Sequence, residues 1–193
     1  MRHIFNLLRA EEGASLLEFA IVVPLLVVFV VGIYDFSAAF NQRQKIEQAA
    51  QEGAVVAGAQ PMSDIETATG NPASLQPVLT AVFNSLTSSG VLPNAGASCT
   101  QPFPAPTRPS PAGVAWIYTI PNCSSTYASD TLVITINRGW VSGGATAAVG
   151  TSVQVVYPYH WRFGGVIQLL FPGPNGYSTP TQVTAKATVH NQM

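Results

Sequence analysis

The stretch Gly13-Ala14-Ser15-Leu16-Leu17-Glu18-Phe19 opens an apolar run that continues to Tyr34. It places one carboxylate, that of Glu18, inside an otherwise apolar segment. A charged side chain within a membrane-spanning helix costs about 2.5 to 3.5 kcal/mol on insertion scales, which predicts a function and a partner for Glu18. Cleavage after Gly13 would supply that partner, because the new amino group on Ala14 would lie one helical turn before Glu18. The alternative is that Glu18 only marks the edge of the membrane segment, at headgroup depth.

The apolar run is long enough to cross a membrane. A helix from Ala14 to about Phe36 rises roughly 34 Å, which covers the hydrocarbon core of a bilayer. Arg2 and Arg9 precede the run, so the positive-inside rule places the N-terminus in the cytoplasm. We therefore expect a cytoplasmic leader at 1–13, a transmembrane helix at 14–36, and the remaining chain outside the cytoplasm.

Two other interpretations of the N-terminus stay open. An ordinary secretory signal peptide would be cut near Ser37-Ala38-Ala39, so that the mature protein would begin near Phe40. A simple anchor would not be cut at all. The length of the apolar run and the position of Glu18 at its entrance argue against the signal peptide.

Beyond the membrane the composition turns polar but stays compatible with a helix, so residues 37–60 are expected to continue the same helix. A stripe of mostly small side chains recurs at helical spacing, at Ala39, Ile46, Ala50, Gly53 and Ala57. A glycine inside a helix costs about 1 kcal/mol relative to alanine, so Gly53 indicates close approach of another element. That element is either the chain's own sheet or a neighbouring helix in an assembly.

Residues 61–193 are expected to form one extracytoplasmic α+β domain. A short helix is predicted from Pro72 to about Ser88, with Asn71 as its N-cap. A proline-rich loop after Gly90 should prevent regular pairing. Runs of β-branched and aromatic residues then predict an antiparallel sheet of about four strands, at 114–120, 131–138, 151–161 and 181–190.

Apolar and aromatic residues of the distal part allow more than one interpretation. The segment from Phe163 to Phe171 either closes the core over the sheet or forms an exposed patch for a partner or the outer leaflet. Aromatic residues at alternate strand positions are typical of core or cross-strand pairs, although a sugar-binding surface is the alternative. These aromatics are Trp116, Tyr118, Trp140, Tyr157, Tyr159 and Trp161.

The composition argues against nucleic-acid binding and catalysis. Charged residues make up 9% of the chain, and there is no basic surface to neutralise phosphates. Acidic residues are too scarce in the distal part to complete a hydrolytic site, because Asp130 is the sole one beyond Glu66. No cofactor is expected, and no metal either, because the distal cysteines and histidines (Cys99, Cys123, His160 and His190) lack the close paired spacing of metal sites.

The two cysteines, Cys99 and Cys123, both lie beyond the anchor. In an exported domain the pair is expected to form one disulfide, which would close a 25-residue loop and stabilise the fold by about 3 kcal/mol in the chain-entropy model. In a cytosolic domain the same residues would be free thiols.

Taken together, the N-terminal motif resembles the processing site of type IV prepilins, and more closely the TadE-like family. The resemblance rests on Gly13, Glu18-Phe19-Ala20 and Pro24, with Arg9 upstream. Looser likeness extends to the segments 51–54, 155–159 and 183–188. Glu11 and Glu12 depart from the pattern, because they make the leader less basic next to the cut.

The resemblance implies a minor pilin or pseudopilin of a tight-adherence pilus in the bacterial inner membrane. It implies cleavage between Gly13 and Ala14 by a membrane-embedded prepilin peptidase, and a role of Glu18 with Phe19 in assembly. The implied partners are the membrane, the major pilin, other minor pilins and the pilus assembly platform, and adhesion and biofilm formation are the implied outcomes. A permanently anchored extracytoplasmic binding or adhesion module remains the alternative.

Overall fold

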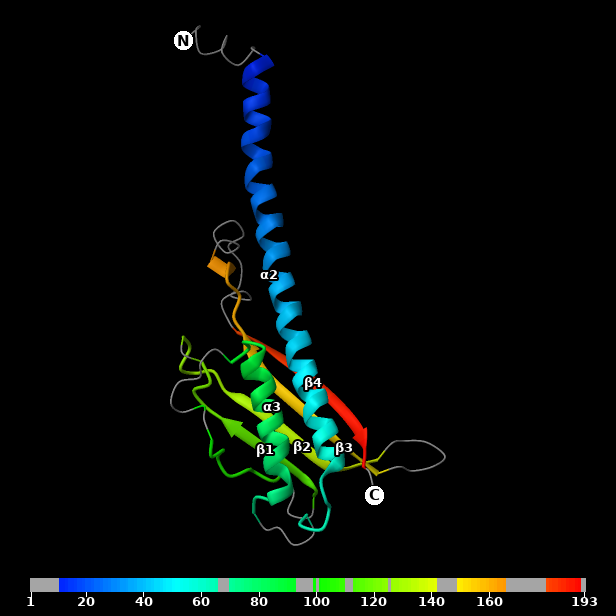
Figure 1. Cartoon of the computed structure of the whole chain (residues 1–193). Helices are drawn as coiled ribbons and strands as arrows, with labels where there is room; N and C mark the ends of the chain where they lie inside the picture. The colour runs from blue at the N-terminus through cyan, green and yellow to red at the C-terminus, as the bar shows by residue number, and fades with distance from the viewer. Residues whose placement is uncertain are drawn as a thin grey trace. The chain divides into compact units, whose positions relative to one another are not determined.

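The computed structural model describes residues 11–65, 70–92, 99, 101–109, 113–124, 126–141, 149–165 and 180–191. They form a 49-residue helix α2 (Glu11–Ala59), a 3-10 helix η1 (Ala73–Leu75) and the helix α3 (Gln76–Ser88), as Figure 1 shows. Four strands complete the fold: β1 (Ala115–Ile120), β2 (Leu132–Val141), β3 (Val149–Tyr159) and β4 (Thr181–His190). The expected α+β class, with one long helix, one short helix and a four-stranded antiparallel sheet, is confirmed.

The chain divides into two compact units. One comprises residues 1–39 and 160–180, and the other comprises residues 40–159 and 181–193. The second unit holds the sheet, whose strands follow the order β1-β2-β3-β4 with every neighbouring pair antiparallel. Strands that are consecutive in sequence are therefore neighbours in space, which is the simplest arrangement for short connections.

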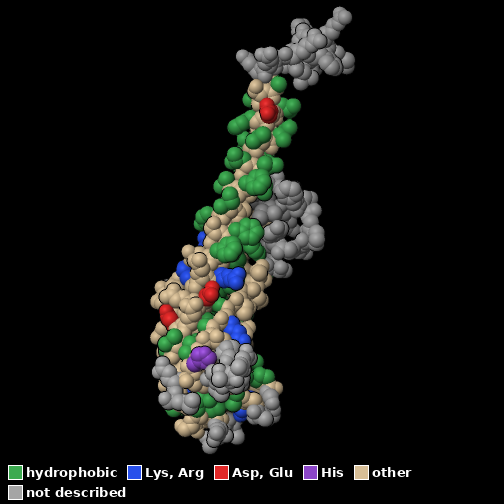
Figure 2. All heavy atoms as spheres, turned by 90° about the vertical axis from the view of Figure 1, so that its right-hand side faces the viewer, with side chains coloured by type: hydrophobic (Ala, Val, Ile, Leu, Met, Phe, Trp, Pro, Cys, Tyr) green, Lys and Arg blue, Asp and Glu red, His purple; other side chains and the backbone are tan. Residues whose placement is uncertain are grey.

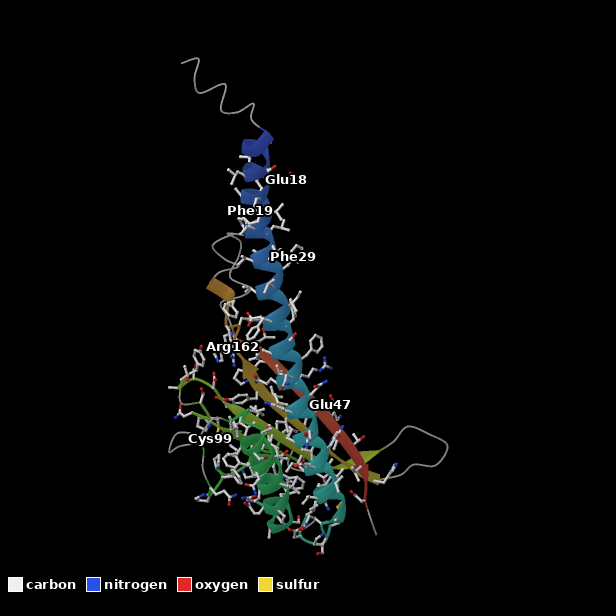
Figure 3. The ribbon with its side chains drawn as sticks, turned by 45° about the horizontal axis from the view of Figure 1, so that its top comes forward. Glu18, Phe19, Phe29, Glu47, Cys99 and Arg162 are labelled. Atoms are coloured by element: carbon white, nitrogen blue, oxygen red, sulfur yellow. A yellow bond between two sulfur atoms is a disulfide. The ribbon has the colours of Figure 1, made fainter. Side chains whose placement is uncertain are left out.

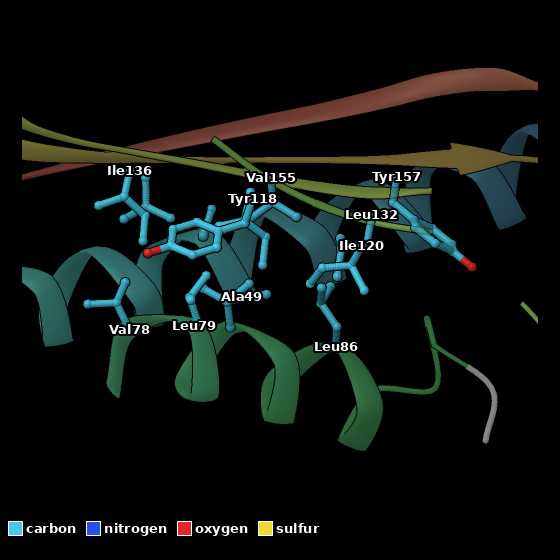
Figure 4. Packing of buried hydrophobic residues seen from close by; sticks show 14 of the residues in the cluster. Ala49, Val78, Leu79, Leu86, Tyr118, Ile120, Leu132, Ile136, Val155 and Tyr157 are labelled. Carbon is cyan, nitrogen blue, oxygen red and sulfur yellow. The ribbon is translucent and has the colours of Figure 1, made fainter. Parts of the chain in front are cut away.

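One face of the sheet is apolar because apolar residues alternate along its strands. On β2, Leu132, Ile134 and Ile136 are fully buried, and on β3 Val153 and Val155 lie at the same face. Figure 4 shows Leu132, Ile136 and Val155 between the sheet and the helices. The expected strands are found, and β3 ends at Tyr159 rather than at the expected Trp161, so His160 lies just beyond the strand.

Residues 40–59 of α2 and the whole of α3 cover the apolar face of the sheet (Figure 4). The stripe of small residues on α2 is buried here, at Ile46, Ala50, Gly53 and Ala57. A methyl group added to Gly53 would overlap Val82 Cγ2 of α3 and lie 3.4 Å from Val153 Cγ1 of β3. The close approach that Gly53 indicated is therefore made by the chain's own helix and sheet.

The second helix ends at Ser88 as expected, but its start differs from the prediction. The 3-10 turn η1 comes first, and Leu75 then precedes α3 without a capping side chain. Asn71 as N-cap is wrong, because its Oδ1 accepts a hydrogen bond of 2.6 Å from the hydroxyl of Tyr118. A buried tyrosine hydroxyl needs such a partner.

The proline-rich loop pairs with the sheet at one point, which the sequence did not predict. Thr107 and Ile117 of β1 form an isolated antiparallel bridge, with two backbone hydrogen bonds of 2.8 Å. Thr107 can make this bridge because threonine keeps its backbone N–H. The prolines around it in the loop have no N–H and cannot donate such a bond.

Candidate functional site: the N-terminal helix and its contacts

The residues of the predicted processing site lie in the first turns of α2. Gly13 is half-buried, and Ala14, Glu18 and Phe19 are exposed. Figure 3 labels Glu18 and Phe19 on this part of the helix. Because an α-helix rises 1.5 Å per residue, Ala14 and Glu18 lie about 6 Å apart along the axis on one face. A carboxylate near a helix N-terminus also interacts favourably with the helix dipole.

Large apolar side chains cover the helix after this site. Most of those between Leu16 and Phe36 are more than half exposed, including Phe19 at 67% and Phe29 at 64%. Figure 2 shows them gathered along this part of α2. Within the described residues, α2 is the one helix long and apolar enough to cross a membrane, by length and composition. An exposed apolar surface of this length needs an apolar environment to cover it.

A buried carboxylate that was not predicted from the sequence lies at the end of this apolar segment. Asp35 of α2 is 1% exposed, and both of its oxygens accept hydrogen bonds from backbone amides. Oδ1 accepts from the N–H of Arg162 at 3.2 Å, and Oδ2 accepts from the N–H of Phe163 at 3.1 Å. The signal that could have found it was an acidic residue between two aromatics, Tyr34 and Phe36, where the apolar run ends.

The other missed residue is Arg138 of β2, which the alternation of Leu132, Ile134 and Ile136 places on the buried face. Its guanidinium donates to the carbonyl oxygen of Ala57, to that of Gln60 at 2.7 Å and to that of Pro61 at 3.3 Å. Ala57 supplies one of the last carbonyls of α2, and Gln60 and Pro61 follow the helix directly. Carbonyl groups at a helix C-terminus have no amide of a following turn to bond to. Arg138 therefore caps the C-terminal end of the long helix.

The carboxylate of Asp64 interacts electrostatically with Arg138. Asp64 Oδ2 accepts a hydrogen bond of 2.8 Å from the N–H of Ser74. Partial burial raises the pKa of Asp64, but the hydrogen bond from the Ser74 N–H and the charge of Arg138 contribute to a larger lowering, so that the pKa falls below its usual value of 3.8. Burial lowers the pKa of Arg138, and the negative charge of Asp64 opposes that change. The carboxylate thus favours the charged form of the buried arginine.

Cys99 and Cys123 form a disulfide, and both residues are fully buried. The bond joins the loop after α3 to the segment between β1 and β2. The hydroxyl of Tyr157 donates a hydrogen bond of 3.0 Å to the carbonyl oxygen of Cys123. Burial raises the pKa of Tyr157 to about 12, so its hydroxyl stays a donor throughout the physiological range.

The described aromatic residues of the strands belong to the core. Trp116 and Tyr118 are fully buried, Tyr157 and Tyr159 nearly so. The Arg108 guanidinium lies 5.2 Å from the centre of the Trp116 ring, a cation–π distance. The side chain of Trp140 is not among the described ones. Separately, no three His, Cys, Asp or Glu residues in the described part of the chain lie together as metal ligands would. Because their side chains are buried, Trp116, Tyr118, Tyr157 and Tyr159 belong to the core and do not form an exposed ligand surface.

The family model described as TadE-like protein matches residues 13–55. The match begins at Gly13 and includes Ala14, Glu18 and Phe19, and it extends into the buried part of α2. No curated protein and no solved structure matches the chain. The resemblance to the TadE-like family is thus confirmed over this segment, and it indicates a pilin-like protein associated with a Tad pilus. The apolar helix is compatible with a single pass through a membrane.

Proposed function

We propose that this chain is a minor pilin or pseudopilin of a tight-adherence pilus. The premise is the match of residues 13–55 to the TadE-like family model. One observation carries the proposal: the matched segment is a helix with an exposed apolar surface, and this surface holds Glu18 one turn after Ala14. The protein would sit in the bacterial inner membrane through α2, with the sheet outside the cytoplasm. It would act by its fold and contacts rather than by catalysis.

Processing would give Glu18 its partner. A membrane-embedded prepilin peptidase would cut between Gly13 and Ala14, where the missing side chain of Gly13 lets the backbone approach the catalytic groups. The new amino group on Ala14 would carry a positive charge and would compensate the carboxylate of Glu18, within one chain or between neighbouring chains. Neutralised in this way, the helix could leave the bilayer and pack among the apolar helices of a pilus.

The sheet unit would be the part that other subunits or a surface meet. Its core is closed by α3, the disulfide and the Arg138 cap, so it offers a fixed shape at the end of α2. The major pilin, other minor pilins and the assembly platform are the proposed partners, and adhesion and biofilm formation are the proposed outcomes.

The mass of the N-terminal peptide from the mature protein tests the processing step. We expect a peptide that begins at Ala14. A start at Met1 would instead support a permanent anchor, and a start near Phe40 a secreted protein. Gly13→Leu should block cleavage, because its side chain obstructs the peptidase. Gly32→Leu is the matched control, since nothing lies within 4 Å of the Cβ position at Gly32 on the same helix.

Glu18→Gln tests the assembly step. The substitution keeps the size of the side chain but removes the charge that the new amino group would compensate. We expect loss of this protein from sheared pili, or loss of pilus production, with cleavage at Gly13 retained. Glu47→Gln is the matched control, because Glu47 is also an exposed glutamate of α2 but lies outside the apolar run. Equal pilus production by both variants, with equal amounts of the protein in the sheared pili, would refute the proposed role of Glu18.

A further inference from the structure

The contacts of Asp35 join two segments that are far apart in the sequence. Its two oxygens accept from the consecutive amides of Arg162 and Phe163, so the carboxylate fixes this piece of backbone against α2. A buried carboxylate is costly unless it is paired or hydrogen-bonded, and two amide donors compensate it. The hydrogen bonds therefore stabilise one specific position of residues 162–163 along the helix.

Two aromatic pairs flank the carboxylate and fix the same position. The rings of Tyr34 and Phe163 meet edge to face, with centroids 5.7 Å apart, and those of Phe36 and Trp161 do so at 5.5 Å. Such pairs contribute stability beyond the area that they bury. We call the six residues Tyr34, Asp35, Phe36, Trp161, Arg162 and Phe163 the Asp35 clip.

The Asp35 clip lies where the membrane span should end. From Ala14 to Asp35 the helix rises about 32 Å at 1.5 Å per residue, which is close to the thickness of the hydrocarbon core. The large apolar side chains before Asp35 are exposed, and Tyr34 and Phe36 continue this surface at 55% and 54% exposure. The clip is therefore continuous with the surface that a bilayer would cover.

Its chemistry matches the headgroup layer. Tryptophan and tyrosine are enriched where hydrocarbon meets headgroups, because their rings are apolar and their N–H or O–H groups are polar. The exposed side chain of Arg162 carries a guanidinium, which suits lipid phosphate. The carboxylate of Asp35 is turned inward and bonded, so it does not repel that phosphate.

We propose that the Asp35 clip is a membrane-interface anchor that binds phospholipid headgroups of the outer leaflet. Trp161 and Tyr34 lie at the boundary of the hydrocarbon, and Arg162 contacts phosphate. By holding residues 161–163 at one height on α2, Asp35 sets how deeply the helix inserts. The proposal rests on α2 spanning the bilayer, but it does not depend on cleavage at Gly13.

The depth of Trp161 in a bilayer tests the proposal. The unprocessed full chain is reconstituted in vesicles of phosphatidylethanolamine and phosphatidylglycerol whose acyl chains carry bromine either near the headgroup or near the bilayer centre. The contribution of Trp161 to the fluorescence is obtained by subtracting the signal of Trp161→Phe. We expect a larger loss of this contribution with the shallow bromines than with the deep ones. Because the unprocessed chain is used, failed cleavage at Gly13 leaves this result unaffected.

Two outcomes would overturn the anchor. Equal or greater quenching by the deep bromines would place Trp161 in the hydrocarbon. Absence of quenching would also overturn it. In that case, a Trp161 signal that changes with the protein-to-lipid ratio would assign the clip to a contact with a second copy of the chain. A Trp161 signal that does not change with this ratio would assign the clip to the protein's interior.

Asp35→Ala tests the role of the carboxylate. Loss of both acceptors should release residues 161–163, so the preference of Trp161 for shallow bromines should disappear while vesicle flotation shows that the protein is still inserted. Removing a charge from the end of an apolar helix does not hinder insertion. Glu47→Gln, outside the clip on the same helix, should leave the quenching unchanged. An unchanged Trp161 signal in Asp35→Ala would refute Asp35 as the residue that sets the depth.

Discussion

Replacing Arg138 with methionine should destabilise the sheet unit by releasing the C-terminal end of α2. The side chain is fully buried, and methionine nearly keeps its length while removing every donor. The carbonyl of Ala57 keeps a partner, because the N–H of Gln60 donates to it at 3.2 Å. The carbonyls of Gln60 and Pro61 lose the guanidinium donor that they share.

The magnitude follows from these contacts. Hydrogen bonds to a charged group contribute about 1.5 to 3 kcal/mol each, so the loss of two gives roughly 3 to 6 kcal/mol. Relief from burying a guanidinium offsets part of this, because apolar replacements of buried ions regain about 1 to 4 kcal/mol. We expect a net loss of about 2 to 3 kcal/mol. For a chain of this size that corresponds to a fall in Tm of roughly 4 to 12 °C.

The assay is thermal unfolding of the full chain in detergent, followed by near-ultraviolet circular dichroism. Amide hydrogen exchange at residues 57–62 supplies a local measurement, and it should accelerate when the cap is lost. Arg138→Lys keeps the charge but not the planar guanidinium group, so its Tm should lie between that of the wild type and that of Arg138→Met. Lys186→Gln, at an exposed position of β4, is the control. A Tm of Arg138→Met within the error of the wild type would refute the capping role.

Three further predictions concern the same unit. Gly53→Ala should lower the free energy of unfolding by about 1 kcal/mol. Overlap of the new methyl group with Val82 costs about 1 to 3 kcal/mol, and the higher helix propensity of alanine returns about 1 kcal/mol. A variant that is more stable than the wild type in urea unfolding would contradict this. Replacing Cys99 and Cys123 by serine should cost about 3 kcal/mol by the same measurement, whereas unchanged stability would show that the disulfide constrains nothing. Asp64 has a lowered pKa, so its contribution to stability is present above pH 3.8 and is lost as the pH falls through the lower folded value. Asp64→Asn should therefore have a lower Tm than the wild type at neutral pH, and this difference should shrink as the pH falls. A difference in Tm that grows in acid would contradict the prediction.

The elements that depend on local patterns could be predicted from the sequence. The apolar run after Gly13, the strand alternation and the breaks between strands act over a few residues, so they give the element types without knowledge of the fold. Asn71 shows the limit of such rules. Its side chain fits an N-cap by position, but the hydroxyl of Tyr118, 47 residues away, engages it instead. A contact at that separation leaves no periodic signal in the chain.

A long helix with an apolar first part and a carboxylate one turn after a small residue can be predicted from the sequence, because helix period and hydropathy are read along one element. The roles of Gly53, Asp35 and Arg138 depend instead on contacts that form only in the folded chain. Gly53 approaches the chain's own α3, Asp35 accepts amides 127 and 128 residues away, and Arg138 caps a helix end 81 residues before it. A buried polar group must find a partner wherever the fold brings one, and packing rather than sequence spacing fixes where that partner lies.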